Sequence, residues 1–107
     1  MTTIFPWYNM PNMKAALIYH DKKRDEMGNI VETKLWRVPV SDHAPHGFKY
    51  SLVYVVNGVR VIGYDNERGK GDHKHLGGQE LPYDFTSPAA LMTDFLVDLE
   101  AWKRGDL

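Results

Sequence analysis

The chain has 107 residues and no cysteine, and its 13 basic and 14 acidic residues give a formal net charge of −1. This length predicts one domain, and 43% hydrophobic with 25% charged residues is typical of a folded globular protein rather than a disordered chain. The absence of cysteine excludes disulfides, thiolate zinc sites and a cysteine nucleophile. The near-zero net charge excludes a strong overall attraction to nucleic acid. The sequence also has no apolar run of the roughly 20 residues that a transmembrane helix needs.

The first 13 residues differ in character from the rest of the chain. They combine aromatic residues and methionines with two prolines and two asparagines. Such a segment is too aromatic for a free tail and too interrupted for a helix. We therefore expect residues 1–13 to form an aromatic N-terminal arm that lies along a single α+β domain of residues 14–107 or forms a self-association surface, which would make the protein a homodimer.

Two hairpins are predicted next along the chain. Residues 14–23 and 30–38 have strand character and flank Gly28 and Asn29, which tolerate positive φ. Residues 48–56 and 59–65 are joined by Asn57-Gly58, the strongest short-range signal of a tight hairpin.

Pairing Val56 with Val59 sets the register of this second hairpin. It places Tyr54 opposite Val61 and, further along, Lys49 opposite Asn66. Both faces of the hairpin are then apolar, so we expect it at the centre of the sheet with a helix covering at least one face.

The covering helix is predicted from Pro88 to Arg104. Ser87 is a good N-cap, Pro88 suits the first helical position, and Gly105 suits the stop. Its apolar stripe has helical spacing and consists of Leu91, Phe95, Leu99 and Trp102, joined by Met92 and Leu96. The predicted fold is therefore α+β, a four-stranded antiparallel sheet of two hairpins with a C-terminal helix packed on one face.

Residues 66–83, between the last predicted strand and the helix, are predicted as a long loop. The segment holds four glycines and shows no apolar periodicity. Loops of this length in compact domains are usually functional or disordered, and polar loops carried on a sheet are where sites tend to lie.

This loop and the neighbouring strand ends hold the residue types that RNA cleavage requires. Attack of a ribose 2′-hydroxyl on the adjacent phosphate needs a base, an acid and cations that stabilise the phosphate. We predict His46, Glu67, His73 and His75 as catalytic residues, Arg68, Lys70, Gly69 and Gly71 as substrate-binding residues, and Asp72 as the residue that orients the histidines. This reaction uses no metal and no other cofactor.

Two other kinds of site fit the same residues. His73 and His75, with Asp72 and His46, offer nitrogen and oxygen ligands for zinc or manganese. The segment could also bind a phosphate backbone without catalysis. A solvated glycine loop whose charges pair with each other is the structural alternative.

Four segments of the chain resemble the TumE-like family of small bacterial and archaeal proteins. They are LIYHD at 17–21, GNIVETKLWRVP at 28–39, PHGFKYSL at 45–52 and the distinctive GYDNERGKGDHKH at 63–75. The likeness extends from about Lys14 to Trp102. It implies the toxin of a toxin–antitoxin module, paired with a small DNA-binding antitoxin.

Resemblance and residue chemistry together predict a soluble, cytoplasmic toxin that acts on RNA as a metal-independent ribonuclease. The expected partners are the antitoxin and RNA, with no membrane. The alternative is a non-catalytic module that binds nucleic acid or a protein.

Overall fold

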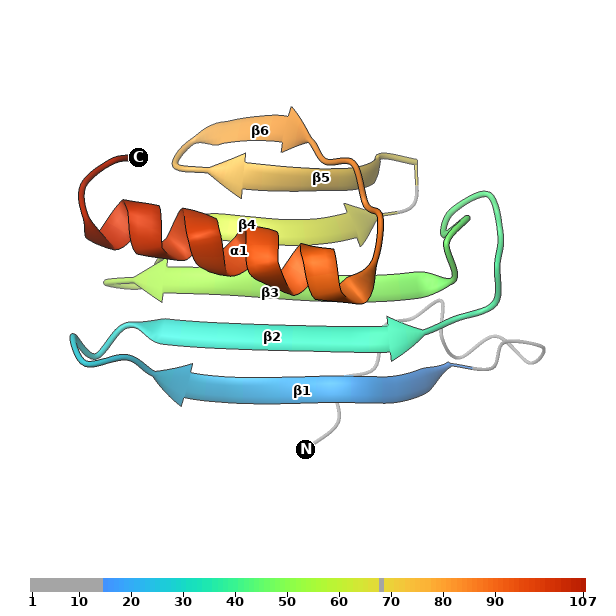
Figure 1. Ribbon diagram of the computed structural model, residues 1–107, viewed down its shortest axis with the longest axis horizontal. Coiled ribbons are helices and arrows are strands. Elements are labelled where there is room, and N and C mark those ends of the chain that lie inside the picture. Colours follow the sequence, from blue (N-terminus) through green and yellow to red (C-terminus); the bar gives the residue numbers. More distant parts are fainter. Residues whose placement is uncertain (1–14, 68) are drawn as a thin grey trace.

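Six strands that follow one another in the chain form one antiparallel sheet, and a helix lies across one of its faces (Figure 1). The computed structural model describes residues 15–67 and 69–107, so the predicted arm, residues 1–13, and Arg68 lie outside the described part. The elements are β1 (Ala16–Arg24), β2 (Ile30–Arg37), β3 (Phe48–Val56), β4 (Val59–Glu67), β5 (Gly71–Leu76), β6 (Gln79–Pro82) and α1 (Pro88–Lys103). The α+β class is confirmed, whereas the predicted number of four strands is wrong.

The two predicted hairpins are both present. β1 and β2 pair around a turn in which Gly28 has a φ of 82°. β3 and β4 are joined by Asn57 and Gly58, whose φ angles of 51° and 77° are both positive, as a type I′ turn requires. Val56 pairs with Val59, and each strand of this hairpin has two further strands on its outer side. The prediction of a central β3–β4 hairpin is confirmed.

Away from this turn, the register of the central hairpin differs from the prediction by one residue. Val61 is an extra residue in β4, so Tyr54 lies opposite Ile62 instead of Val61. The displacement persists to the end of the paired region, so Asn66 does not lie directly opposite Lys49 as predicted. An extra residue of this kind is a β-bulge, which bends the strand and changes which side chains face the core.

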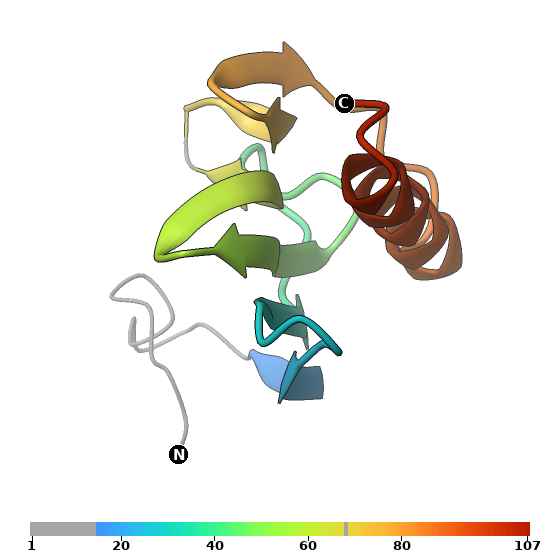
Figure 2. The ribbon, with the colours of Figure 1, turned by 90° about the vertical axis from the view of Figure 1, so that its left-hand side faces the viewer.

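α1 begins at the predicted residue and ends one residue earlier than predicted. The Ser87 side chain accepts a hydrogen bond of 3.0 Å from the backbone N–H of Ala90, and Gly105 adopts a φ of 80° after the last turn. Figure 2 shows the helix on one side of the sheet. Its buried residues are Leu91, Phe95 and Leu99, and they join a core made of Val31, Leu35, Tyr50, Leu52, Tyr54, Ile62 and Tyr64.

The predicted loop over residues 66–83 is wrong, because most of this segment forms the end of β4 and the strands β5 and β6. Two residues of β5 that face the helix side are charged, Asp72 and Lys74, so the apolar alternation that marks a half-buried strand is missing. Both charges have partners in the structure. The Nζ atom of Lys74 lies 3.3 Å from Asp98 of α1, and Asp72 accepts a 2.6 Å hydrogen bond from the Tyr50 hydroxyl.

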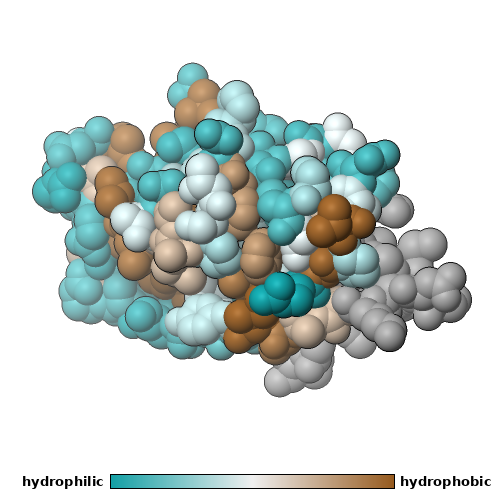
Figure 3. Space-filling model, turned by 45° about the vertical axis from the view of Figure 1, so that its right-hand side comes forward, coloured by the Kyte–Doolittle hydropathy of each residue, from teal (hydrophilic) through white to brown (hydrophobic). Residues whose placement is uncertain are grey.

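α1 covers the helix side of β1 and β2 only in part. A groove of about 460 Å³ lies there, lined by Tyr19, Asp21, Lys23, Val31, Thr33, Leu35, Pro88, Ala89, Met92 and Leu96. In the view of Figure 3, hydrophobic residues reach the molecular surface in patches that hydrophilic residues separate. Among the described residues, no helix has the length and apolar character needed to cross a membrane.

Candidate functional site

Strand alternation divides the polar residues of β4 and β5 between the two faces of the sheet. Asp65 and His73 pair in adjacent strands, so their side chains share a face, and His75 shares it because it lies two residues further along β5. Tyr64, next to Asp65 in β4, points to the other side and donates a hydrogen bond to Asp98 of α1. Asp65, His73 and His75 therefore lie on the sheet surface opposite α1, which we call the far face.

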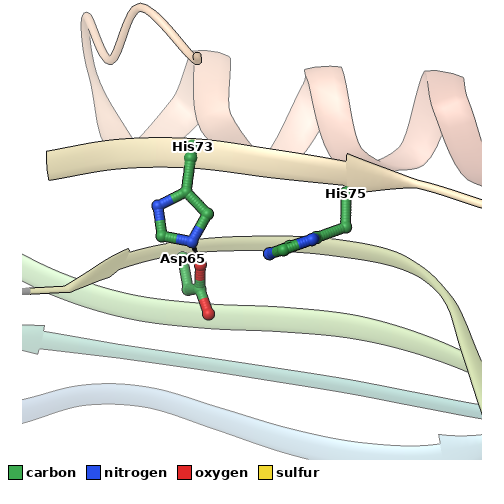
Figure 4. Close-up of side chains that lie close together, drawn as sticks. All are labelled: Asp65, His73 and His75. Carbon is green, nitrogen blue, oxygen red and sulfur yellow. Dashed lines mark ion pairs between the residues drawn. The ribbon is translucent and has the colours of Figure 1, made fainter. Parts of the chain in front are cut away.

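The two histidines of the far face lie beside each other and beside the carboxylate of Asp65 (Figure 4). The ring centroids of His73 and His75 are 5.1 Å apart, with the ring planes at 81°. The Nε2 atom of His73 lies 2.6 Å from Oδ1 of Asp65 and 3.9 Å from Oε2 of Glu80. The structure thus brings the predicted pair His73 and His75 together. It adds Asp65 and Glu80, which sequence reasoning did not select.

His73 is the more buried of the two histidines, with 3% of its surface exposed. Its Nδ1 atom lies 3.0 Å from the backbone carbonyl oxygen of Gly71. A carbonyl oxygen can only accept a hydrogen bond, so Nδ1 carries a proton in this arrangement. Nε2 of His73 and Oδ1 of Asp65 are both buried, and among the described residues neither atom makes a hydrogen bond.

His75 is half-buried and has a positively charged neighbour. Burial lowers the pKa of its imidazole, and the charge of Arg60 lowers it further, against the opposite effect of Asp65. Gly63, which pairs with His75, lacks a side chain and so leaves room for Arg60, whose Cδ would lie 2.9 Å from a Cβ at that position. Arg60 is therefore a cation of this site that sequence reasoning missed.

The turn between β4 and β5 holds the other predicted substrate-binding residues. Gly69 and Gly71 have φ angles of 82° and 72°, which glycine adopts readily. The ammonium group of Lys70 lies 3.6 Å from a carboxylate oxygen of Glu80, which connects this turn to the far-face carboxylates. Glu67 is exposed at the end of β4. Arg68, also predicted here, lies outside the described residues.

His46 and Asp72 lie together, but on the helix side of the sheet. Nε2 of His46 is 2.9 Å from Oδ1 of Asp72, and Nδ1 accepts a 3.2 Å hydrogen bond from the backbone N–H of Phe48. The His46 ring also packs on Phe85, with the ring centroids 3.9 Å apart. Asp72 therefore orients His46 and not the far-face histidines, and both nitrogens of His46 have partners.

The Tyr50 hydroxyl completes this helix-side group. It donates a 2.6 Å hydrogen bond to the same Oδ1 atom of Asp72 that His46 contacts. Burial and the Asp72 carboxylate raise the pKa of Tyr50, so it remains a donor over the whole physiological range. The predicted site residues thus fall into two groups that the sheet separates, with His46 and Asp72 on one side and the His73–His75 pair on the other.

The comparisons with known proteins bear on what these groups serve. No curated protein and no solved structure matches the chain. The family model described as Toxin TumE matches residues 10–103, which confirms the resemblance read from the sequence segments between residues 17 and 75. Because the match spans most of the sequence, the chain belongs to the TumE toxin family.

Proposed function

We propose that this protein is the toxin of a toxin–antitoxin module and that it acts on RNA as a metal-independent ribonuclease. Membership of the toxin family supports the first part, and it makes a small DNA-binding antitoxin the expected partner. The observation that carries the second part is the His73–His75 pair, with ring centroids 5.1 Å apart on the sheet face opposite α1.

The far face holds the groups that 2′-hydroxyl attack on a phosphodiester needs. His75 is the more exposed imidazole and takes the proton from the 2′-hydroxyl. His73 in its imidazolium form returns the Nε2 proton to the leaving 5′ oxygen, and the Asp65 carboxylate, 2.6 Å from Nε2, balances the charge of that form. Arg60 and Lys70 bind the phosphate and stabilise the charge that develops on it, so a metal ion is not required for this step.

His46 has a different role in this proposal. It lies with Asp72 on the helix side of the sheet, away from the far-face histidines, and its ring packs on Phe85. We assign His46 and Asp72 to the fixation of β5 against β3, which holds the far-face residues of β5 in place.

The test incubates the purified full chain with end-labelled RNA in the presence of EDTA. Cleavage with 2′,3′-cyclic phosphate ends is expected, and His75→Gln should reduce its rate about 10²- to 10⁴-fold, the usual effect of removing one acid or base. His20→Gln is the matched control, because His20 is also a partly exposed strand histidine with a carboxylate partner, Glu32, at 2.9 Å. Toxicity on expression should follow the same order.

Two results would contradict this proposal. Equal cleavage by His75→Gln and His20→Gln would remove the far-face pair from the reaction. RNA that is bound but not cut would instead favour the non-catalytic binding module.

A further inference from the structure

Three potential metal ligands converge on the far face. A carboxylate oxygen of Asp65 and one ring nitrogen each of His73 and His75 all lie within 4.8 Å of one another. The three residues come from the adjacent strands β4 and β5, whose backbone pairing fixes their spacing. No loop has to become ordered to bring them together.

The Nε2 atom of His73 makes a short contact with one of the other two potential ligands, Asp65. With the Nδ1 proton donated to the Gly71 carbonyl, Nε2 is the ring nitrogen left to bind another group, and it lies 2.6 Å from Oδ1 of Asp65. Both atoms are buried, and they make no hydrogen bond with each other or with another described residue. An imidazole nitrogen and a carboxylate oxygen this close require a positive charge between them: a proton makes the contact an ion pair, and a metal ion can take the place of that proton.

Metal-binding histidines commonly show this arrangement, since the ring nitrogen that does not bind the metal donates its N–H to a backbone carbonyl. We propose that Asp65, His73 and His75 bind a divalent transition metal ion of the zinc type, and that the bound ion switches off the proposed RNA cleavage. Only the second half depends on the proposed function.

The ligand types select the class of ion. Two imidazole nitrogens and a carboxylate suit Zn²⁺ and its neighbours Co²⁺ and Ni²⁺, whereas Mg²⁺ and Ca²⁺ prefer oxygen ligands. Glu80, whose Oε2 is 3.9 Å from Nε2 of His73, is available as a fourth ligand. The two carboxylates also offset the positive charge of Arg60 near His75.

The metal ion would inhibit RNA cleavage because it binds the same ring nitrogens of His73 and His75 that the proposed reaction uses for proton transfer. A nitrogen that is bound to a metal ion can neither accept nor donate the proton that RNA cleavage transfers. Metal binding at this site and acid–base catalysis by His73 and His75 are therefore mutually exclusive.

The binding test needs no RNA. The full chain is stripped with a chelator, dialysed and titrated with Zn²⁺ by calorimetry and with Co²⁺ by visible absorption. One ion per chain is expected, with no competition from excess Mg²⁺. His75→Gln and Asp65→Asn should each weaken binding at least ~10-fold, since even residues behind the ligands are worth ~10–100-fold.

A matched control separates the site from the general properties of the chain. His20→Gln should bind as the parent does, because His20 lies in β1 beside Glu32 and contacts none of the three proposed ligands. Circular dichroism and thermal unfolding establish that each variant is folded, and half-buried His75 is the substitution that the fold tolerates best. Absence of Zn²⁺ and Co²⁺ binding, or binding unchanged in both His75→Gln and Asp65→Asn, would overturn the site.

The two proposals fail in different ways. Cleavage in EDTA by a chain that binds no metal overturns the metal site and leaves the ribonuclease in place. Specific metal binding by a chain that never cuts RNA supports the site and overturns the ribonuclease. Cleavage that persists at saturating Zn²⁺, or that begins only when Zn²⁺ is added, overturns the inhibitory role.

Discussion

Replacing Phe95 by alanine tests the packing of α1 on the sheet, on which the position of every site residue depends. Phe95 is fully buried and meets Tyr64 of β4 edge to face, with ring centroids 6.0 Å apart and planes at 85°. Truncation of a buried phenylalanine removes its transfer free energy and leaves a cavity, which together lower the free energy of unfolding by about 3–5 kcal/mol. Alanine is the best helix former, so helix propensity does not contribute to this loss.

Urea unfolding followed by circular dichroism measures the change, with the midpoint and slope fitted separately. A domain of this kind has about 5–15 kcal/mol of stability in total, so the expected loss should be a large displacement of the midpoint. Leu96→Ala is the matched control, because Leu96 is the next residue of the same helix and is 46% exposed. A Phe95→Ala midpoint equal to that of Leu96→Ala would refute the assigned packing of α1.

Three further predictions concern polar groups. The hydrogen bond from Tyr54 holds the pKa of Asp25 below its ordinary value. The ionised Asp25 carboxylate therefore stabilises the fold above about pH 4, and this stabilisation is lost as the pH falls through the folded-state pKa. Asp25→Asn should make the free energy of unfolding, measured by urea unfolding, depend less on pH in the acid range. Tyr50→Phe should lower the free energy of unfolding by about 1–3 kcal/mol in the same assay, because it removes a donor from the partly buried Asp72 carboxylate. Arg60→Gln, an exposed change, should leave that free energy within about 0.5 kcal/mol and raise the KM for labelled RNA.

The first four strands and the helix were predictable because their signals are local. Asn57-Gly58 fixes a tight turn, and Ser87, Pro88 and Gly105 mark the two ends of a helix with an apolar stripe. None of these inferences requires knowledge of distant partners. The bulge at Val61 was not predictable in this way, because it depends on how the completed sheet packs against α1.

β5 and β6 were missed for a physical reason that concerns their inward-facing residues. Sequence periodicity detects a strand by its apolar face, and β5 presents Asp72 and Lys74 there. Their charges become acceptable only next to Tyr50 and Asp98, which lie far away in the sequence. The Gly77-Gly78 pair was the one local signal, since two glycines between short segments are typical of a hairpin turn.

The residues of the candidate site could likewise be predicted only in part from the sequence. His73 and His75 could be selected because they are imidazoles in one short polar segment, and selecting them by residue type requires no strand register. Asp65 and Arg60 could not, because each reaches the histidines across strand pairings that the predicted four-stranded sheet did not contain.

The contrast between the two faces explains why we place chemistry on one of them. On the helix side, the buried polar groups are matched: His46 and Tyr50 both contact Asp72, and Lys74 contacts Asp98. Such matched groups stabilise a fold and need nothing more. On the far face, Nε2 of His73 and Oδ1 of Asp65 are buried 2.6 Å apart without a hydrogen bond. A buried pair that is satisfied only when a cation lies between its atoms is expected where a proton or a metal ion binds, and this is why the Asp65–His73 pair, and not His46, marks the candidate site.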